Sequence, residues 1–317
     1  MSVKARAVRF LAPRSVAVED VHLDEPTGDE LLVRTVYSGI SAGTELLAYR
    51  GELDAATPLD ETLGAFEGGF NYPFGYGYSA VGRTLDGTAV FAFHPHQDVF
   101  TAPAADVLTL PEGLDLRLAT MFPLVETALQ LSLDAGPVLG ETVLVTGLGA
   151  IGLLTSLLLT RAGASVVALE PMQWRRELAA SVGITALSPE ESDHDAALLV
   201  ETSGAPRALA DGLARLHHEG TALVGSWYGT KPVALPLGAD FHRRRLTIRS
   251  SQVSTIPAAQ QDRWTRDRRR GTALALMPTL PLAALATTEF AFEDAPAAYQ
   301  ALDRGAPGVL HAALRYE

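Results

Sequence analysis

The sequence predicts an α/β protein in which a β-rich domain precedes a doubly wound parallel sheet. Three observations lead to this fold class. A glycine-rich turn joins an apolar segment to a helix-like segment in ETVLVTGLGAIG, residues 141–152. From about residue 142 to 251, strand-like and helix-like segments alternate, which is typical of a parallel sheet covered by helices. Up to about residue 120, short β-like runs recur between glycine turns instead.

The composition fits a globular protein and excludes several classes of function. The chain has 317 residues, of which 47% are hydrophobic and 20% charged, enough for two domains with their own cores. A formal net charge of −12 argues against a nucleic-acid partner. There is no cysteine, which excludes disulfides, thiol nucleophiles and cysteine-ligated metal sites.

Neither a signal peptide nor a membrane span is expected. The N-terminal MSVKARAVRF lacks a long apolar run, and no stretch of eighteen apolar residues occurs. We therefore expect a cytoplasmic protein without a membrane partner.

The first domain, residues 1–121, is expected to be a compact β-barrel or sandwich. Its β-like runs are VKARAVRFL, SVAVEDV, ELLVRTVYSGI, AVGRTL and TAVFAFH. From Leu118 the pattern changes to helix, and the second domain is expected over residues 122–285. Its five recognisable strands are Val143–Thr146, Ser165–Leu169, Ala196–Glu201, Ala222–Ser226 and Leu246–Ser250.

The tail, residues 286–317, is expected to return to the first domain. FAFEDAPAAYQALD predicts a strand, a turn and a helix, and VLHAALRY predicts a closing strand. Just before the tail, Asp262–Arg270 is charge-dense and is interpreted as a solvated helix face.

The glycine turn predicts a site for a dinucleotide pyrophosphate. Gly147, Gly149 and Gly152 have the G-x-G-x-x-G spacing between a strand and the helix Leu153–Ala162. The first glycine allows the tight turn, the second lets the backbone approach phosphate, and the third lets the helix pack close to the strand. A plain βαβ crossover with a glycine turn is the alternative. The predicted contacts in the turn are Gly147, Gly149, Ala150, Ile151 and Gly152.

Glu170 indicates which dinucleotide is bound. It ends the next strand about twenty residues beyond the glycines, where a carboxylate can accept hydrogen bonds from a ribose diol and repels a 2′-phosphate. NAD is therefore the expected cofactor. Arg175 and Arg176 begin the next helix; a solvated helix face is the preferred interpretation, and reaching the 2′-phosphate of NADP is the alternative.

Polar and small residues after three later strands are expected to line the same groove, because ligands of open α/β sheets bind at the carboxyl ends of the strands. The alternative for each is an ordinary turn residue. They are Thr202, Ser203, Gly225, Ser226, Ser251 and Gln252.

The domain order resembles the medium-chain dehydrogenase/reductase superfamily over essentially the whole chain. Four segments carry the likeness. SGISAGTELLAYRG (38–51) is similar to the first active-site loop of the superfamily, and GYSAVG (77–82) is similar to its G-H-E-x-x-G segment. FPLVETAL (122–129) is similar to its helix entering the cofactor domain, and EDAPAAYQALD (293–303) is similar to its C-terminal helix. SGISAGTE and GYSAVG look closest to the bacteriochlorophyllide dehydrogenase-like group. The resemblance implies a Rossmann domain, a GroES-like β domain and a homodimer formed through the sheet edges of the cofactor domains.

The sequence departs from the zinc enzymes of that superfamily at the metal. Those enzymes hold catalytic zinc with a cysteine of the first loop, the histidine of G-H-E, and a cysteine or carboxylate of the entering helix. The matching positions here are Ser41 or Ala42, Tyr78 and Glu126. One carboxylate without thiolate or imidazole partners is not an ordinary zinc site, and the four-cysteine structural lobe is missing. We therefore predict no zinc.

Without a metal, hydrogen-bond donors and a proton relay must handle charge on the substrate oxygen. Tyr78 is the first candidate donor; a tyrosine packed below the cofactor is the alternative. Glu126 is a candidate base or orienting group; a packing or hydrogen-bonding residue is the alternative. Ser41 is a candidate hydroxyl relay, whereas Thr44 and Glu45 are interpreted as a helix cap and a first-turn acid.

His94 and His96 stand in the motif His-Pro-His-Gln after a predicted strand. Three interpretations stay open. They are an exposed structural turn, a catalytic histidine that faces the substrate, with His94 as the candidate, and a metal site, for which only Asp98 stands at ligand spacing.

Together these features predict a zinc-independent, NAD(H)-preferring oxidoreductase. It transfers hydride between nicotinamide C4 and a small-molecule secondary alcohol or ketone. Two alternatives stay open: reduction of an activated C=C bond, as in zinc-free quinone or enoyl reductases, and a dinucleotide-binding sensor or structural protein without turnover.

Overall fold

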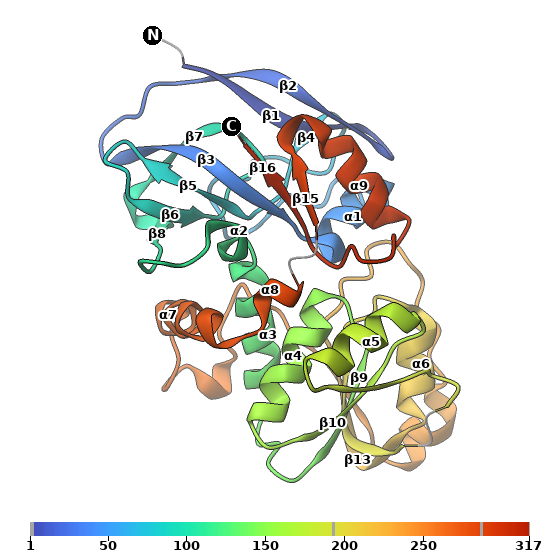
Figure 1. Ribbon diagram of the computed structural model, residues 1–317. Coiled ribbons are helices and arrows are strands. Elements are labelled where there is room, and N and C mark those ends of the chain that lie inside the picture. Colours follow the sequence, from blue (N-terminus) through green and yellow to red (C-terminus); the bar gives the residue numbers. More distant parts are fainter. Residues whose placement is uncertain (1–2, 192–193, 286–287, 317) are drawn as a thin grey trace. The chain divides into compact units, whose positions relative to one another are not determined.

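The chain folds into two compact units (Figure 1). The computed structural model describes residues 3–191, 194–285 and 288–316. Unit 1 comprises Met1–Pro123 with Met277–Glu317, and unit 2 comprises Leu124–Leu276. Ala286, where the sequence places the return to the first domain, lies outside the described residues.

Unit 2 is built, within its described residues, on a six-stranded parallel sheet. The strands are β9 (Thr142–Thr146), β10 (Ser165–Leu169), β11 (Thr185–Leu187), β12 (Ala196–Glu201), β13 (Leu216–Val224) and β14 (Thr247–Ser250). They stand in the order β11-β10-β9-β12-β13-β14, so the strand order reverses between β9 and β12. This is the doubly wound order of dinucleotide-binding domains, which confirms the predicted α/β sheet.

Helices alternate with the strands of unit 2 or flank them in the chain. They are α3 (Phe122–Ala135), α4 (Ala150–Arg161), α5 (Gln173–Ser181), α6 (Pro206–Leu213) and α7 (Arg266–Leu276), with short helical turns at Leu237–Phe241 and Ala258–Gln260. Helix α4 contacts β9 and β10, and α6 contacts β12 and β13. Leu209 and Leu213 of α6 are buried against Leu199 of β12, because the i, i+4 spacing places both on one helix face.

Unit 1 holds two sheets among its described residues. A three-stranded sheet has the order β2-β1-β4, and a larger sheet runs β15-β16-β3-β5-β6-β8 with β7 paired to β3. The strands are β1 (Val3–Ala12), β2 (Ser15–Leu23), β3 (Glu30–Ile40), β4 (Phe74–Gly75), β5 (Ala80–Thr84), β6 (Ala89–Ala92), β7 (Val99–Pro103), β8 (Val107–Thr109), β15 (Thr288–Ala291) and β16 (Ala312–Arg315).

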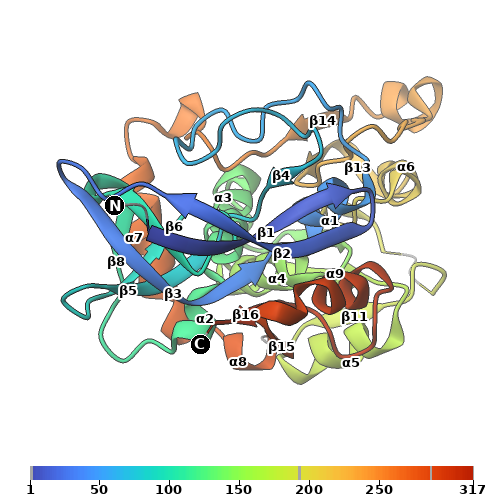
Figure 2. The same ribbon diagram turned by 90° about the horizontal axis from the view of Figure 1, so that it is seen from above.

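The C-terminal segment completes the β-rich unit. Strand β16 pairs antiparallel with β3, and β15 pairs parallel with β16, so the tail lies beside the early strand (Figure 2). The helices of unit 1 are α1 (Ala42–Arg50), α2 (Leu116–Ala119), α8 (Leu282–Leu285) and α9 (Ala295–Asp303), with short turns at Ala104–Asp106, Met277–Thr279 and Phe292–Asp294. The predicted completion of the β domain by the tail is confirmed.

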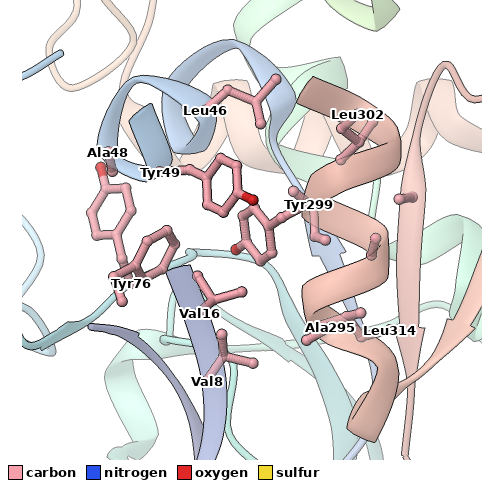
Figure 3. Close-up of a cluster of buried hydrophobic side chains, with 14 of the residues drawn as sticks. Val8, Val16, Leu46, Ala48, Tyr49, Tyr76, Ala295, Tyr299, Leu302 and Leu314 are labelled. Atoms are coloured by element: carbon pink, nitrogen blue, oxygen red, sulfur yellow. The ribbon is translucent and has the colours of Figure 1, made fainter. Parts of the chain in front are cut away.

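Aromatic side chains dominate the core of unit 1 between α1, α9 and β1. The rings of Tyr49 from α1 and Tyr299 from α9 stack with centroids 5.4 Å apart (Figure 3). Phe10 of β1 meets Tyr299 edge-on at 5.3 Å. Tyr299 is therefore fixed on two sides by rings.

Several sequence-based boundaries are wrong. Strand β13 ends at Val224, so Gly225 and Ser226 follow the strand instead of ending it. Helix α4 begins at Ala150, three residues earlier than expected, because the glycine turn itself opens the helix. Strand β11 is absent from the predicted strands, since three residues are too few to display a periodicity.

The interpretation of Asp262–Arg270 as a solvated helix face is wrong for Arg269, whose side chain is only 2% exposed.

No helix in the described residues combines the length and the apolar character that crossing a bilayer requires.

Candidate functional site

The glycine turn of unit 2 is shaped as a cradle. Gly147 follows β9 with φ +86°, and a Cβ there would lie 2.6 Å from Ser203 Cα. A Cβ on Gly152 would lie 2.0 Å from the Gly147 carbonyl oxygen and 2.5 Å from Thr202 Oγ1. Gly149 is the N-cap of α4, and a Cβ added to it would have no atom of the described residues within 4 Å. Two glycines are thus required for close packing, and the third leaves open space at a helix N-terminus, which suits an anion.

Ala150 and Ile151 are the first residues of α4, directly after that open position. Their backbone N–H groups belong to the first helical turn, which has no intrahelical acceptors. They are therefore placed as the sequence predicts for contacts with a phosphate.

Glu170 follows β10 and is 2% exposed. Its Oε2 accepts a hydrogen bond from Leu148 N at 2.7 Å, within the glycine turn, and its Oε1 accepts from Met172 N at 2.9 Å. Arg175 Nη1 lies 3.8 Å from Oε2. Arg176 donates to the backbone oxygens of Glu170 and Pro171, each at 2.8 Å. The structure thus brings Glu170 to the glycine turn and Arg175 to Glu170, whereas Arg176 holds the backbone.

The residues predicted after the later strands fall into two groups. Thr202 Oγ1 donates to the carbonyl oxygens of Thr146 and Gly147 at 2.9 and 3.0 Å, so Thr202 and its neighbour Ser203 adjoin the glycine turn. Ser226 Oγ accepts from Gly204 N at 2.9 Å, which joins the ends of β12 and β13.

The other three residues contact different parts of unit 2. Gly225 lies against Leu131 of α3, from which a Cβ would be 2.8 Å away. Ser251 donates to the Asp134 carboxylate of α3 at 2.6 Å. Gln252 accepts from Ser254 N within its own loop.

Glu201 is a buried carboxylate that the sequence analysis did not single out. It ends β12, is 0% exposed, and accepts hydrogen bonds from Ser203 N at 2.7 Å and Gly204 N at 3.1 Å. Tyr228 Oη also donates to it at 2.7 Å, and burial together with this carboxylate raises the pKa of Tyr228. Glu201 therefore fixes the loop that adjoins the glycine turn. The available signal was an acidic residue at the end of an apolar strand.

In unit 1, Tyr78 and Ser41 form a hydroxyl pair. The Tyr78 phenol donates to Ser41 Oγ, and Thr44 Oγ1 lies 3.4 Å from the same phenol oxygen. Burial raises the pKa of Tyr78 to about 12, so the phenol is protonated at neutral pH. Gly77, with φ +97°, makes this position possible, because a Cβ there would lie 2.3 Å from the ring of His96. Two of the predicted catalytic residues are thus brought together.

Behind this pair lies a buried polar network centred on Glu45. Glu45 is 0% exposed; its Oε1 accepts from Ser41 N at 2.7 Å, and its Oε2 meets His96 Nε2 at 2.9 Å and the Tyr299 hydroxyl. His96 Nδ1 lies 2.7 Å from Ser38 Oγ. We call Glu45, His96, Tyr299 and Ser38 the Glu45 network.

The network corrects two interpretations from the sequence. Glu45 is a first-turn acid as expected, but Ser41 is the N-cap and Thr44 lies inside α1. His96 is fully buried and does not belong to an exposed turn. The burial of Glu45 and His96 could not be predicted from the sequence, because the partners of Glu45 come from distant segments.

His94, the predicted catalytic histidine, contacts Phe100. The two rings stack with centroids 4.0 Å apart, and His94 Nδ1 lies 3.0 Å from the Pro95 carbonyl oxygen. Burial lowers the pKa of His94 to about 4, so the ring is neutral at physiological pH. These contacts favour a packing role for His94.

Glu126 lies in α3 of unit 2 and is paired with a buried arginine. Arg269 Nε donates to Glu126 Oε1 at 3.0 Å, and Arg269 Nη1 donates to Gln130 Oε1 at 2.6 Å. Arg269 also donates to the Val253 carbonyl oxygen at 2.6 Å. Burial raises the pKa of Glu126 although Arg269 opposes the rise. These contacts favour the packing and hydrogen-bonding alternative for Glu126 over a base.

No group of three or more histidine, aspartate or glutamate side chains that could hold a metal ion occurs among the residues that the structure describes.

Known proteins with similar sequences and folds are dehydrogenases. D-guloside 3-dehydrogenase of Escherichia coli K12 is 26% identical over 298 residues, 81% of this chain and 83% of that protein. A Cereibacter sphaeroides enzyme, 2-desacetyl-2-hydroxyethyl bacteriochlorophyllide A dehydrogenase, is 26% identical over 274 residues, 78% of this chain and 81% of that protein. The crystal structure of L-idonate 5-dehydrogenase from Escherichia coli superposes with a TM-score of 0.81 at 16% identity, covering 99% of both chains. No protein-family model matches the chain.

These relatives and the shared fold support the predicted assignment to the medium-chain dehydrogenase/reductase superfamily. The predicted superfamily, its two-domain fold class and an enzyme of the oxidoreductase class are thereby confirmed. Within this superfamily the chain differs at the positions that match zinc ligands. Ser41 and Tyr78 bond to each other, and Glu126 bonds to Arg269.

Proposed function

We propose that this medium-chain dehydrogenase/reductase is a zinc-independent oxidoreductase that interconverts a secondary alcohol and a ketone with NAD(H). Unit 2 holds the cofactor, and the hydroxyl pair of unit 1 handles the substrate oxygen. The observation that carries the proposal is the Tyr78–Ser41 hydrogen bond, formed where zinc enzymes of the superfamily have metal ligands.

The hydroxyl pair has the chemistry that stabilises a developing alkoxide. The Tyr78 phenol donates to Ser41 Oγ, which leaves the Ser41 proton free to donate to a substrate oxygen. A donor aimed at a developing oxyanion accelerates such a reaction about 10²–10³-fold. Because the pKa of Tyr78 is about 12, the pair acts as a hydrogen-bond donor at neutral pH and not as a base. This favours polarisation of a ketone for reduction.

The residues at the matching zinc positions do not suit zinc. Zinc sites in proteins use thiolate, imidazole and carboxylate ligands, whereas two of these positions offer neutral hydroxyls. The third, Glu126, already bonds to Arg269, and the same guanidinium also bonds to Gln130. We therefore derive no step through a metal.

The glycine cradle fits a nicotinamide dinucleotide. Gly149 and the first turn of α4 supply open space and unpaired N–H groups for the pyrophosphate, and Glu170 lies beside the turn as an acceptor for ribose hydroxyls. When bound, the nicotinamide supplies or accepts the hydride. An Escherichia coli alcohol dehydrogenase of the same fold carries NADH, and a Sinorhizobium meliloti dehydrogenase carries NADP. We infer NADH as the preferred form, since the carboxylate of Glu170 disfavours a 2′-phosphate.

The names of the relatives suggest where to look for the substrate. They act on a guloside at carbon 3, on L-idonate at carbon 5 and on 2R,3R-butanediol. Each of these is a secondary alcohol beside another oxygen substituent. We infer a vicinal diol or hydroxyketone as the substrate class.

A substrate panel tests the proposed function. It contains methyl guloside, idonate, 2,3-butanediol and acetoin, together with a benzoquinone and an enone, and NADH absorbance is the readout. We expect turnover of at least one hydroxyketone or diol, and Tyr78→Phe should lower kcat/KM by about 10²-fold. Turnover confined to the quinone or enone would replace the proposal with C=C reduction, and NADH binding without turnover would favour a sensor. Full activity after exhaustive dialysis against a chelator is expected, with zinc well below one ion per chain by elemental analysis.

A further inference from the structure

We infer that Glu45 is a positioning residue for the hydroxyl pair: it binds the backbone N–H of Ser41 at the N-terminus of helix α1 and so holds the Ser41 hydroxyl where it faces Tyr78. The inference rests on the proposed function of the pair. It concerns a residue with no contact to the reacting atoms, whose effect passes through the backbone of Ser41.

The N-terminus of α1 departs from the usual capping pattern. A serine at the N-cap normally turns its Oγ back to accept from a backbone N–H of the first turn. Ser41 makes no such side-chain bond; Thr44 N and Glu45 N donate to its backbone oxygen instead, at 3.1 and 2.9 Å. Its Oγ accepts from Tyr78. The hydroxyl best suited to cap this helix is thus committed to the tyrosine.

Glu45 binds a different N–H at this end of the helix. Its Oε1 accepts from Ser41 N at 2.7 Å, a contact like the one that the N3 acid of a capping box makes, here from the fourth helical residue. A carboxylate in the first turn also interacts favourably with the positive end of the helix dipole. The bond holds the backbone of Ser41 at φ −84° and ψ 88°, and this backbone determines where the hydroxyl lies.

Glu45 is itself fixed from three other elements. The Tyr299 hydroxyl of α9 donates to Oε2, and His96 from the loop between β6 and β7 meets it at 2.9 Å. His96 continues to Ser38 of β3 at 2.7 Å, and Ser38 meets the Tyr316 hydroxyl at 2.8 Å. Figure 3 shows Tyr299 directed from α9 toward α1. The Glu45 network thus joins α1, β3 and the C-terminal segment.

Burying the Glu45 network costs more desolvation free energy than capping a helix requires. An exposed glutamate in the first turn caps a helix without desolvation, whereas Glu45, His96 and Tyr299 are each 0% exposed. Such a network is stable only when every polar atom has a partner, and it then holds one geometry. A fixed geometry is what an active-site donor needs, since small displacements cost large factors in rate.

Charged and titratable groups of the described residues surround the pair. Tyr78 is faced by Glu45 of α1, by Asp60 and by Tyr76, and the two carboxylates add to burial in keeping the phenol protonated. Glu45 in turn is faced by His96, Tyr299 and His311. Substitutions of Glu45 can therefore change the geometry of its hydrogen bonds and its negative charge separately.

Three substitutions of Glu45 separate position from charge. Glu45→Gln keeps an oxygen for Ser41 N and presents amide N–H groups to His96 and to the Tyr299 oxygen, which can accept, so kcat should stay within about threefold of wild type. Glu45→Asp keeps the charge but is one methylene too short for both contacts, and Glu45→Met has similar volume and no acceptor. Both should lower kcat about tenfold, the worth of one good hydrogen bond. Turnover is followed with the diol, sugar or hydroxyketone of the panel that gives the highest kcat/KM.

A double-mutant cycle with Ser41→Ala provides the deciding measurement. If Glu45 acts through Ser41, Glu45→Asp combined with Ser41→Ala should lower kcat no further than Ser41→Ala alone. Losses that multiply would overturn the inference and leave the proposed function standing. If Ser41→Ala and Tyr78→Phe both leave kcat unchanged, the catalytic role of the pair is refuted and the inference falls with it. Equal loss in Glu45→Gln and Glu45→Asp would also overturn it.

Tyr316→Phe is the matched control. It removes a buried hydrogen bond at the far end of the network, to Ser38, and touches neither Glu45 nor Ser41. It should lower the melting temperature and leave kcat unchanged. A loss of kcat as large as that of Glu45→Asp would mean that kcat follows general stability, which overturns the positioning role.

Discussion

Glu126 of unit 2 and Glu45 of unit 1 are both buried in polar clusters, and the two clusters are built differently. In unit 2, Glu126 faces the guanidinium of Arg269 at 3.0 Å, and both side chains are nearly inaccessible. In unit 1, Glu45 is surrounded by the Ser41 amide, the Tyr299 hydroxyl and the His96 ring. One carboxylate is thus balanced by a permanent charge and the other by hydrogen-bond donors.

The difference separates a structural carboxylate from a positioning one. Arg269 bonds Glu126, Gln130 and the Val253 carbonyl oxygen at once, so it ties α7 to α3 and to the loop after β14. Arg270 Nε lies 3.8 Å from the same Glu126 oxygen, so a second guanidinium supports this ion pair. The donors around Glu45 lead instead to Ser41, whose hydroxyl meets Tyr78. A buried carboxylate can therefore hold elements together or orient a reactive group, and its partners decide which.

The largest effect is expected when the arginine of the structural pair is removed. Arg269→Met takes away the guanidinium that bonds Glu126 at 3.0 Å and leaves it Arg270 at 3.8 Å, so the free energy of unfolding should fall by about 3 kcal/mol. Burial already raises the pKa of Glu126, so the stability this group contributes is present at low pH and is lost as pH rises. Losing Arg269 raises that pKa further. Urea unfolding should therefore show a larger loss at a mildly alkaline pH than at a mildly acidic one.

The paired substitution controls this experiment. Glu126→Leu together with Arg269→Met removes both charges, and it should recover most of the lost stability. A double variant as unstable as Arg269→Met would show that the arginine acts through its backbone contacts and not through Glu126.

Substitutions of the glycines in the cofactor turn are expected to have the next largest effects. In Gly152→Ala the new Cβ would lie 2.0 Å from the Gly147 carbonyl oxygen, so the backbone must shift, at a cost of about 1–3 kcal/mol. In Gly149→Ala the Cβ meets no atom of the described residues within 4 Å, so the melting temperature should not change. Because the new methyl group fills the space left for phosphate, Gly149→Ala should weaken NADH binding, measured by fluorescence titration. Unchanged NADH affinity would refute the proposed phosphate contact.

Glu170 should control the choice of dinucleotide. Wild type is expected to bind NADH more tightly than NADPH. Glu170→Ala removes the acceptor for ribose hydroxyls and should weaken NADH about tenfold while affecting NADPH less. Both affinities are measured by the same titration. Tighter binding of NADPH by the wild type would mean that Arg175 outweighs the carboxylate.

The smallest loss of stability is expected for an exposed ion pair. Arg207 and Asp211 of α6 form an i, i+4 pair at 3.2 Å, with side chains 92% and 64% exposed. Asp211→Ala should change stability by less than about 0.5 kcal/mol, because solvent screens such a pair. Urea unfolding measures both this variant and Arg269→Met. A comparable loss in the two would contradict the role assigned to burial.

The cofactor turn and the longer strands of both units could be predicted from the sequence; ELLVRTVYSGI matches β3 residue for residue. The spacing of Gly147, Gly149 and Gly152 reports local backbone requirements, and the structure places the turn as expected. Strands β10 and β12 match the predicted residues, since a buried parallel strand is a continuous apolar run. Strand β11, with three residues, carries no such pattern.

The sequence by itself determined the alternation of strands and helices and the cofactor turn, because these depend on periodicity and on local spacing along the chain. Only the tertiary structure decided what the polar side chains do. Glu45 meets His96 across 51 positions and Tyr299 across 254, and Glu126 meets Arg269 across 143. Burial and hydrogen-bond partners are properties of the packed chain, so residues with identical carboxyl groups acquire different functions only when the fold brings their partners to them.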